Sequence, residues 1–204
     1  MTVQMANHWW WRPGWGPGTR FYTWHLTFDD APDVHRYLAE AREALDGVPG
    51  LDLIPDQWLH LTMQGVGDVQ DVSPDDVQAI SQAAARRITD IPVFDLRLGA
   101  PIITAEAVES LVEPAEPVRA LRAAIRDAIR EVWQRVPEDE DGFVPHVSVA
   151  YSNGDGPAAP VQTALDTLDT EPPTCTVTHA DLIAIGRDEQ MYTWETIARA
   201  PLKE

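Results

Sequence analysis

The 204-residue sequence predicts an α+β fold in which antiparallel-rich strands form the sheet structure and helices cover its outer faces. Two observations support this class. Four segments with helical spacing of apolar residues are interspersed with strand-like segments, and many of these strands are separated by short, hairpin-like turns. With 44% apolar residues, the chain is large enough to bury one core, and no linker divides it into independent domains.

The first 19 residues differ in composition from the rest of the chain. Residues 7–19 hold four tryptophans, and the prolines and glycines between them prevent a regular helix. We therefore expect residues 1–19 to form an ordered, aromatic-rich arm attached to a single domain over residues 20–204. Packing of the arm against the body is the favoured interpretation, and a lid that contacts a ligand is the alternative.

The first half of the domain predicts strands that alternate with helices. Residues 20–28 alternate as a strand, and its apolar side chains should meet the helices while Thr23, His25 and Thr27 occupy the opposite face. A helix follows to about residue 46, and a strand pair covers about residues 51–64. Ser73, followed by a proline and two aspartates, is a strong N-cap for the next helix.

The second half repeats this order. The predicted strands and helices are, in sequence, strands at 92–103 and 107–113, a helix at 116–136, a strand at 144–151, a helix at 158–168, and strands at 174–187 and 191–199. In the helix at 116–136, arginines recur at helical spacing, which predicts a solvated face paired with nearby acids. These residues are Arg119, Arg122, Arg126 and Arg130.

The charge balance excludes one class of partner. Fifteen basic and 33 acidic residues leave a formal net charge of −18, which repels polyanions and argues against non-specific binding of long nucleic acid. The single cysteine, Cys175, has no partner for an internal disulfide or a cysteine zinc site. No apolar run is long enough to cross a membrane and no signal sequence is recognisable, so we expect a cytoplasmic protein without a membrane partner.

A histidine followed two positions later by a hydroxyl residue occurs three times. The copies are His25-Leu-Thr27, His60-Leu-Thr62 and His146-Val-Ser148. Because residues i and i+2 of a strand share a face, each copy can present an imidazole and a hydroxyl group to one ligand. Two copies facing each other would form a symmetric phosphate clamp, and at least one of the three copies can be incidental.

The order of elements around the second and third copies resembles the 2H phosphoesterases, the superfamily that includes 2′-5′ RNA ligases and 2′,3′-cyclic phosphodiesterases. The resemblance covers about residues 20–199, and the 86 positions between His60 and His146 are also similar to that family. It implies a bilobal, pseudo-twofold fold whose two concave sheets line a central cleft. It also implies that His60, Thr62, His146 and Ser148 are catalytic.

The chemistry of a cyclic phosphate suits these residue types. Opening a 2′,3′-cyclic phosphate requires the attacking water to lose a proton and the departing ribose oxygen to gain one, and two imidazoles can perform both transfers. Thr62 and Ser148 would donate hydrogen bonds to the non-bridging oxygens. We expect neither a metal ion nor another cofactor, and the sequence leaves open which histidine is the base and which the acid.

Four further residues are candidate substrate contacts. Trp58 and His25 should share the cleft face with the histidine motifs, and Trp58 is suited to stack on a base. Tyr151 stands where many RNA ligase relatives have an arginine, so a charge that would neutralise phosphate is missing at this position. The sequence therefore supports a hydrolytic activity more strongly than a ligase activity. Arg187 or Arg97 is a candidate for replacing that charge. If the arm is a lid, its tryptophans would stack on a base.

Three functional readings stay open on sequence alone. The first is hydrolysis of a 2′,3′-cyclic or 2′-5′-linked nucleotide or RNA end, with the reverse ligation as an optional second activity. The second is a phosphodiesterase for a small cyclic phosphate, such as an ADP-ribose derivative or a cyclic oligonucleotide. The third is a nucleotide-binding module without turnover. The sequence predicts no oligomeric state.

Overall fold

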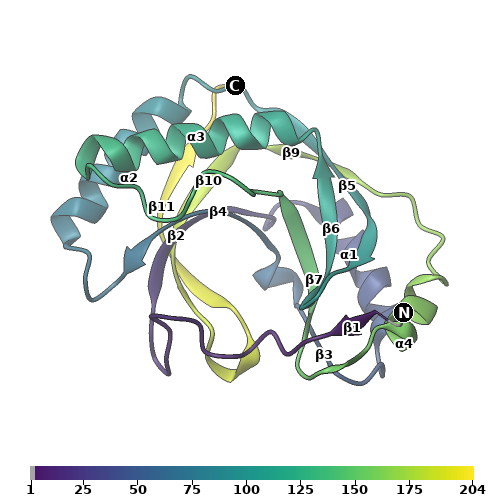
Figure 1. Cartoon of the computed structure of the whole chain (residues 1–204). Helices are drawn as coiled ribbons and strands as arrows, with labels where there is room; N and C mark the ends of the chain where they lie inside the picture. The colour runs from purple at the N-terminus through teal and green to yellow at the C-terminus, as the bar shows by residue number, and fades with distance from the viewer. Residues whose placement is uncertain (1–2) are drawn as a thin grey trace.

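Two antiparallel sheets stand side by side in the computed structural model, which describes residues 3–204 (Figure 1). The four-stranded sheet contains, in spatial order, β11 (Thr193–Pro201), β10 (His179–Gly186), β2 (Phe21–Thr27) and β4 (His60–Asp68). The five-stranded sheet contains β3 (Leu51–Leu53), β7 (His146–Ser152), β6 (Ala107–Glu113), β5 (Phe94–Ile103) and β9 (Thr174–Val177). A short ladder joins β1 (Gln4–Met5) to β8 (Gly156–Pro157).

Helices cover the outer side of each sheet, which completes two lobes (Figure 1). The four-stranded lobe carries α2 (Pro74–Ile88) and α3 (Ala115–Val132), and the five-stranded lobe carries α1 (Pro32–Leu45) and α4 (Ala159–Leu165). The chain crosses between lobes, because α1 follows β2 but packs on the five-stranded lobe, and α3 follows β6 but packs against β4. Within residues 3–204, no helix has the length and apolarity needed to span a bilayer.

The predicted α+β class and bilobal arrangement are confirmed, and the packing follows from the sequence pattern. In β2, Trp24 and Leu26 are fully buried. In α3, the residues at helical spacing that face the sheet are buried, including Leu121, Ile125 and Ile129. The Ser73 hydroxyl accepts a hydrogen bond from the Asp76 backbone N–H, as the predicted N-cap requires.

The predicted strand pair at 51–64 is wrong. β3 pairs with β7, whereas β4 pairs with β2, so the two segments belong to different sheets. Between them the chain turns through a 3₁₀ helix at Asp56–Trp58 and passes from one lobe to the other. Alternation within each strand could not reveal this, because the period of two fixes the faces of a strand and not its partner.

The predicted solvated arginine face on α3 is also partly wrong. Arg122 and Arg126 are each 6% exposed. The Arg122 guanidinium donates to the carbonyl oxygens of Met63, Asp139 and Glu140, and Arg126 donates to the Gln64 side chain. These two arginines therefore hold the loop after α3 against β4. Arg119 and Arg130 are exposed to solvent, as predicted.

A buried carboxylate ties three strands of the four-stranded sheet together. Asp181 of β10 is fully buried and accepts two hydrogen bonds from Arg199 of β11, at 2.8 and 2.9 Å. It also accepts one from the Thr27 hydroxyl of β2 at 2.7 Å. The hydroxyl of the His25-Leu-Thr27 motif is therefore engaged in a structural contact.

We predict that Asp181→Ala lowers the free energy of unfolding by about 2–3 kcal/mol, because it removes the acceptor of three hydrogen bonds. This loss of stability is smaller than the loss expected for breaking a fully buried ion pair, because the Arg199 side chain is 44% exposed and can be hydrated. Denaturant unfolding measures the change. The exposed Asp127, which pairs with Arg130, provides the control, and Asp127→Ala should change stability by less than about 0.5 kcal/mol.

Candidate active site

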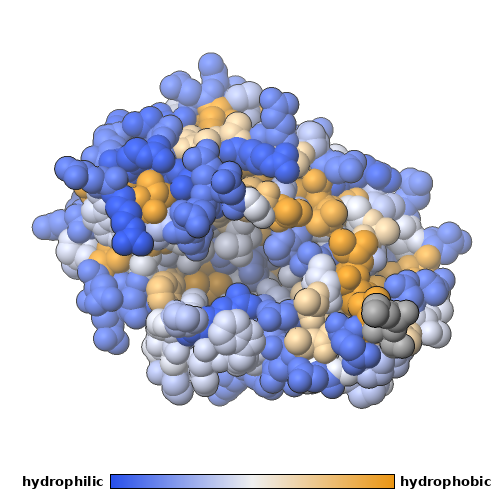
Figure 2. Space-filling model, viewed as in Figure 1, coloured by the Kyte–Doolittle hydropathy of each residue, from blue (hydrophilic) through white to orange (hydrophobic). Residues whose placement is uncertain are grey.

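A cavity of about 560 Å³ lies between the two sheets, and the face shown in Figure 2 is hollowed at its centre. Its lining includes His60 and Thr62 from β4, and His146 and Ser148 from β7. The strands β4 and β7 contact each other, and each motif histidine is the first residue of its strand. The structure thus brings both motifs to one cavity, each with its imidazole and hydroxyl on the cavity side.

Both histidines are anchored in the same way. The Nδ1 atom of His60 lies 2.8 Å from the carbonyl oxygen of Trp58, and Nδ1 of His146 lies 2.9 Å from that of Val144. A carbonyl only accepts, so each Nδ1 carries a hydrogen, and the neutral ring has its lone pair on Nε2. This shared contact orients each ring and leaves Nε2 available to accept or donate a proton.

His60 is the more enclosed of the two histidines. It is 8% exposed, its ring stacks on His25 at 4.6 Å between centroids, and the rings of Tyr192 and Trp194 meet it edge to face. Burial, with a smaller contribution from the nearby His146, lowers the pKa of His60 to about 4, and the bond to the Trp58 carbonyl opposes this shift. His60 is therefore uncharged at neutral pH.

His146 has a different environment. Its side chain is 40% exposed, and its Nε2 atom lies 3.5 Å from the Glu109 carboxylate. A protonated His146 would form an ion pair with Glu109. The two rings thus differ in solvent exposure and in their charged neighbours, although their backbone anchors match.

The structure places His25 beside the His60-Leu-Thr62 motif. His25 is 1% exposed and also lines the cavity, and its Nε2 atom lies 3.3 Å from the Thr62 hydroxyl. Burial lowers the pKa of His25 well below its ordinary value, with a further contribution from His60. An uncharged His25 can therefore orient the Thr62 hydroxyl without adding a positive charge.

The other predicted contacts divide between the cavity and its surroundings. Tyr151 lines the cavity, and burial raises the pKa of its phenol, so it is uncharged. Trp58 does not share the strand face of His60, because it lies in the 3₁₀ helix and packs edge to face on Trp194 outside the cavity lining. Its placement in a strand next to His60 was wrong, since β4 begins only at His60.

Arg187 lies behind the cavity and does not line it. The residue is 3% exposed, and its Nη2 donates to the His8 carbonyl at 2.8 Å. Its guanidinium carbon lies 5.3–6.0 Å from the ring centroids of four aromatic residues, namely Trp9, Trp11, Trp15 and Tyr192. Arg187 is therefore positioned to hold the N-terminal arm, and the structure does not bring it to the substrate cavity.

Sequence reasoning did not identify several residues that line the cavity. From the arm this is His8, and from the domain they include Glu106, Glu109, Glu138 and Tyr192. Arg12 and Trp15 also line the cavity, as expected from the alternative in which the arm contacts a ligand. The aromatic composition of the arm was the available signal for its ordering, but its position over the cavity depends on tertiary contacts. Within residues 3–204, no group of three or more histidines, cysteines or carboxylates is arranged to hold a metal ion.

Comparison with known proteins gives a consistent result. The family described as the 2′-5′ RNA ligase superfamily matches residues 28–189. The fold is similar to TT0787 of Thermus thermophilus, with a TM-score of 0.66, 17% identity, and coverage of 90% of this chain and 98% of that protein. It is also similar to Escherichia coli LigT complexed with 3′-AMP, with a TM-score of 0.67, 16% identity, and coverage of 91% and 99%. No curated protein matches.

The lowered pKa of His60 predicts a pH-dependent stability. The unfolded chain binds a proton at His60 near pH 6.5, whereas the folded protein does so only near pH 4. Between these values the unfolded state binds more protons, so the free energy of unfolding falls as pH falls. We expect His60 to account for about 2 kcal/mol of the loss between about pH 7.5 and about pH 5.

Denaturant unfolding of wild type and His60→Gln at the two pH values measures this contribution. The loss on acidification should be smaller in His60→Gln by about that amount. The pKa values of His8 and His25 are also lowered mainly by burial. These two histidines should therefore account for the loss of stability on acidification that remains in His60→Gln. Equal losses in wild type and His60→Gln would contradict the prediction.

Proposed function

This chain belongs to the 2′-5′ RNA ligase superfamily, a family of 2H phosphoesterases, and on that premise we propose that it hydrolyses a 2′,3′-cyclic phosphate or a 2′-5′ phosphodiester of a nucleotide or RNA end. One observation supports the proposal most directly. Two imidazoles with matching backbone anchors, each with a hydroxyl two residues later, line one cavity from two different sheets. Such an arrangement can supply both the base and the acid of a displacement at one phosphorus.

In the proposed reaction, water attacks phosphorus and the bond from phosphorus to one ribose oxygen breaks. One histidine accepts the water proton, and the other donates a proton to the departing oxygen, so the pair regains its starting number of protons. The Thr62 and Ser148 hydroxyl groups donate hydrogen bonds to the non-bridging oxygens as negative charge gathers there. No step uses a metal ion.

We assign the base to His60 and the acid to His146. Burial keeps His60 uncharged, so its Nε2 lone pair is free to accept the water proton. His146 is more exposed, and the Glu109 carboxylate at 3.5 Å can pair with its ring when that ring is protonated. The His25 ring stacks on His60 and contributes to the burial that favours the neutral starting state of the base.

Nucleotide binding is supported by the structural relatives, because LigT is described in complexes with 3′-AMP, ATP and NADP+. Hydrolysis is favoured over ligation by the charge of the cavity. Tyr151 is buried and uncharged where many RNA ligase relatives have an arginine, and Arg187 faces the arm. A second RNA end would bring additional phosphates into a cavity that has little positive charge to neutralise them.

We predict that His60→Ala and His146→Ala each lower kcat for a nucleoside 2′,3′-cyclic monophosphate by about 10²–10⁴, because each removes one proton transfer. Wild-type turnover should be unchanged in EDTA. Steady-state assays with the cyclic monophosphate and with a 2′-5′-linked dinucleotide measure both effects and identify the preferred bond.

The matched control is His35→Ala in α1, a histidine outside the cavity lining, which should retain wild-type activity. Loss of wild-type activity in EDTA would overturn the metal-independent mechanism. Nucleotide binding without turnover by the wild-type protein would instead support a non-catalytic module.

The hydroxyl groups should have a smaller effect than the imidazoles. We predict that Thr62→Ala and Ser148→Ala each lower kcat by about 10–10³ with less change in KM, because these groups act mainly on charge that develops in the transition state. Thr62→Ser retains the hydroxyl and should recover most of the activity. A rise in KM with unchanged kcat would assign the hydroxyl groups to substrate binding alone.

A further inference from the structure

The N-terminal arm, residues 3–19, passes from the five-stranded lobe to the four-stranded lobe (Figure 1). On the five-stranded lobe, β1 pairs with β8, and the backbone N–H of His8 donates to the Ser152 carbonyl at 2.8 Å. The Trp9 indole donates to Asp52 of β3 at 2.7 Å and packs edge to face on Tyr151. The first part of the arm is thus fixed to this lobe by backbone bonds and by one buried indole.

The second part of the arm is fixed to the four-stranded lobe. Arg187, at the end of β10, donates to the His8 carbonyl, and the Gly18 backbone N–H donates to Asp188 at 2.9 Å. Arg20 also forms an ion pair with Asp188. Since a buried guanidinium needs compensating contacts, the four aromatic rings around Arg187 make the arm and this lobe dependent on each other.

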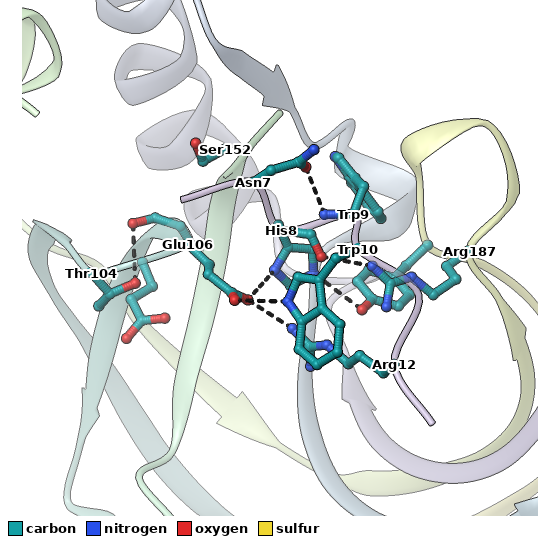
Figure 3. A network of polar contacts seen from close by, with 12 residues as sticks. Asn7, His8, Trp9, Trp10, Arg12, Thr104, Glu106, Ser152 and Arg187 are labelled. Atoms are coloured by element: carbon teal, nitrogen blue, oxygen red, sulfur yellow. Dashed lines mark hydrogen bonds and ion pairs between the residues drawn. The ribbon is translucent and has the colours of Figure 1, made fainter. Parts of the chain in front are cut away.

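A carboxylate holds the middle of the arm over the cavity, and Figure 3 shows the contacts. Glu106 accepts hydrogen bonds from Arg12 at 2.8 Å and from the Trp10 indole at 3.1 Å, and it lies 3.2 Å from Nδ1 of His8. His8 in turn stacks on Tyr151 at 4.2 Å between ring centroids. Both His8 and Arg12 therefore have defined positions before any ligand binds.

The inner side of the arm belongs to the same cavity as the catalytic candidates. His8, Arg12 and Trp15 line it together with His60 and His146. The arm lies outside residues 28–189, which match the superfamily. It therefore adds a wall to the cavity that the matched segment does not supply.

The cavity carries an excess of negative charge. Among the described lining residues there are three carboxylates and one guanidinium, and Arg12 is already paired with Glu106. The carboxylates are Glu106, Glu109 and Glu138. A polynucleotide would bring one phosphate per nucleotide toward this acidic lining without a cationic track to follow.

Building on the proposed function, we propose that the arm completes the substrate site and restricts it to compact, nucleotide-sized cyclic phosphates. A volume of about 560 Å³ falls within the range of about 300–1,000 Å³ typical of pockets that hold one small molecule. The arm blocks one side of the cleft, and the carboxylates oppose the extra phosphates of an RNA chain. An RNA end with the same cyclic phosphate is then a poor substrate.

The test compares kcat/KM for a nucleoside 2′,3′-cyclic monophosphate with kcat/KM for an oligoribonucleotide that ends in the same cyclic nucleotide. We expect the wild-type protein to prefer the mononucleotide by at least about tenfold. Trp9→Ala removes the buried anchor of the arm and should reduce this preference several-fold. Val3→Ala changes a side chain of the same arm that is 63% exposed, and it should keep the wild-type preference.

The outcomes separate this inference from the proposed function. Equal turnover of both substrates by the wild-type protein would overturn the compact-substrate inference and leave phosphoester hydrolysis intact. Turnover of neither substrate would contradict the proposed function and, with it, the inference. If a folded Trp9→Ala protein kept the wild-type preference for the mononucleotide over the oligoribonucleotide, the arm would not determine this preference.

A second measurement on the wild-type protein covers the case in which Trp9→Ala does not fold. Hydrogen exchange of the His8 backbone amide, which donates to Ser152, is followed with and without 3′-AMP at a concentration shown by calorimetry to saturate. We expect slower exchange, because a ligand touching the arm stabilises its closed position. Unchanged exchange at saturation would overturn the arm's role in the site.

Discussion

The contact between β4 and β7 is the constraint on which the site depends. These strands belong to different sheets, and the α-helix that precedes each of them, α1 before β4 and α3 before β7, packs on the opposite lobe. At the start of each strand a histidine is anchored to a carbonyl two residues earlier. The lobes therefore have to pack correctly before the two imidazoles can line one cavity.

Burial then makes two similarly anchored rings chemically different. His60 lies under aromatic residues and beside the neutral His25, whereas His146 is open to solvent and close to Glu109. Desolvation favours the uncharged form of His60 even though its anchoring bond favours the charged one. A symmetric motif can thus provide an asymmetric pair, in which one ring accepts a proton and the other donates one.

The arm gives this family member a cavity with an additional wall. Its position depends on a buried cation, Arg187, whose neighbours are mostly aromatic faces and whose hydrogen bond to His8 is a backbone contact. Glu106 extends the same network to Arg12 at the cavity surface. The lining thereby combines three carboxylates with one partly neutralised guanidinium, a charge balance that opposes a long polyanion more strongly than the compact cyclic phosphate of the proposed function.

The sequence by itself determined the class of fold, the helices α1 to α4, the approximate positions of most strands, and the two histidine motifs, because hydrophobic period, caps and i, i+2 spacing are local properties. It did not predict β1 or β8, and the strand predicted at 174–187 is two strands, β9 and β10, that belong to different sheets. Only the tertiary structure decided that β3 and β4 separate into different sheets, that Trp58 leaves the strand face, and that Arg122 is buried. It also decided that Arg187 faces the arm and that Arg12 lines the cavity. These outcomes depend on which distant segments pack together, and a local pattern carries no information about a partner remote in the chain.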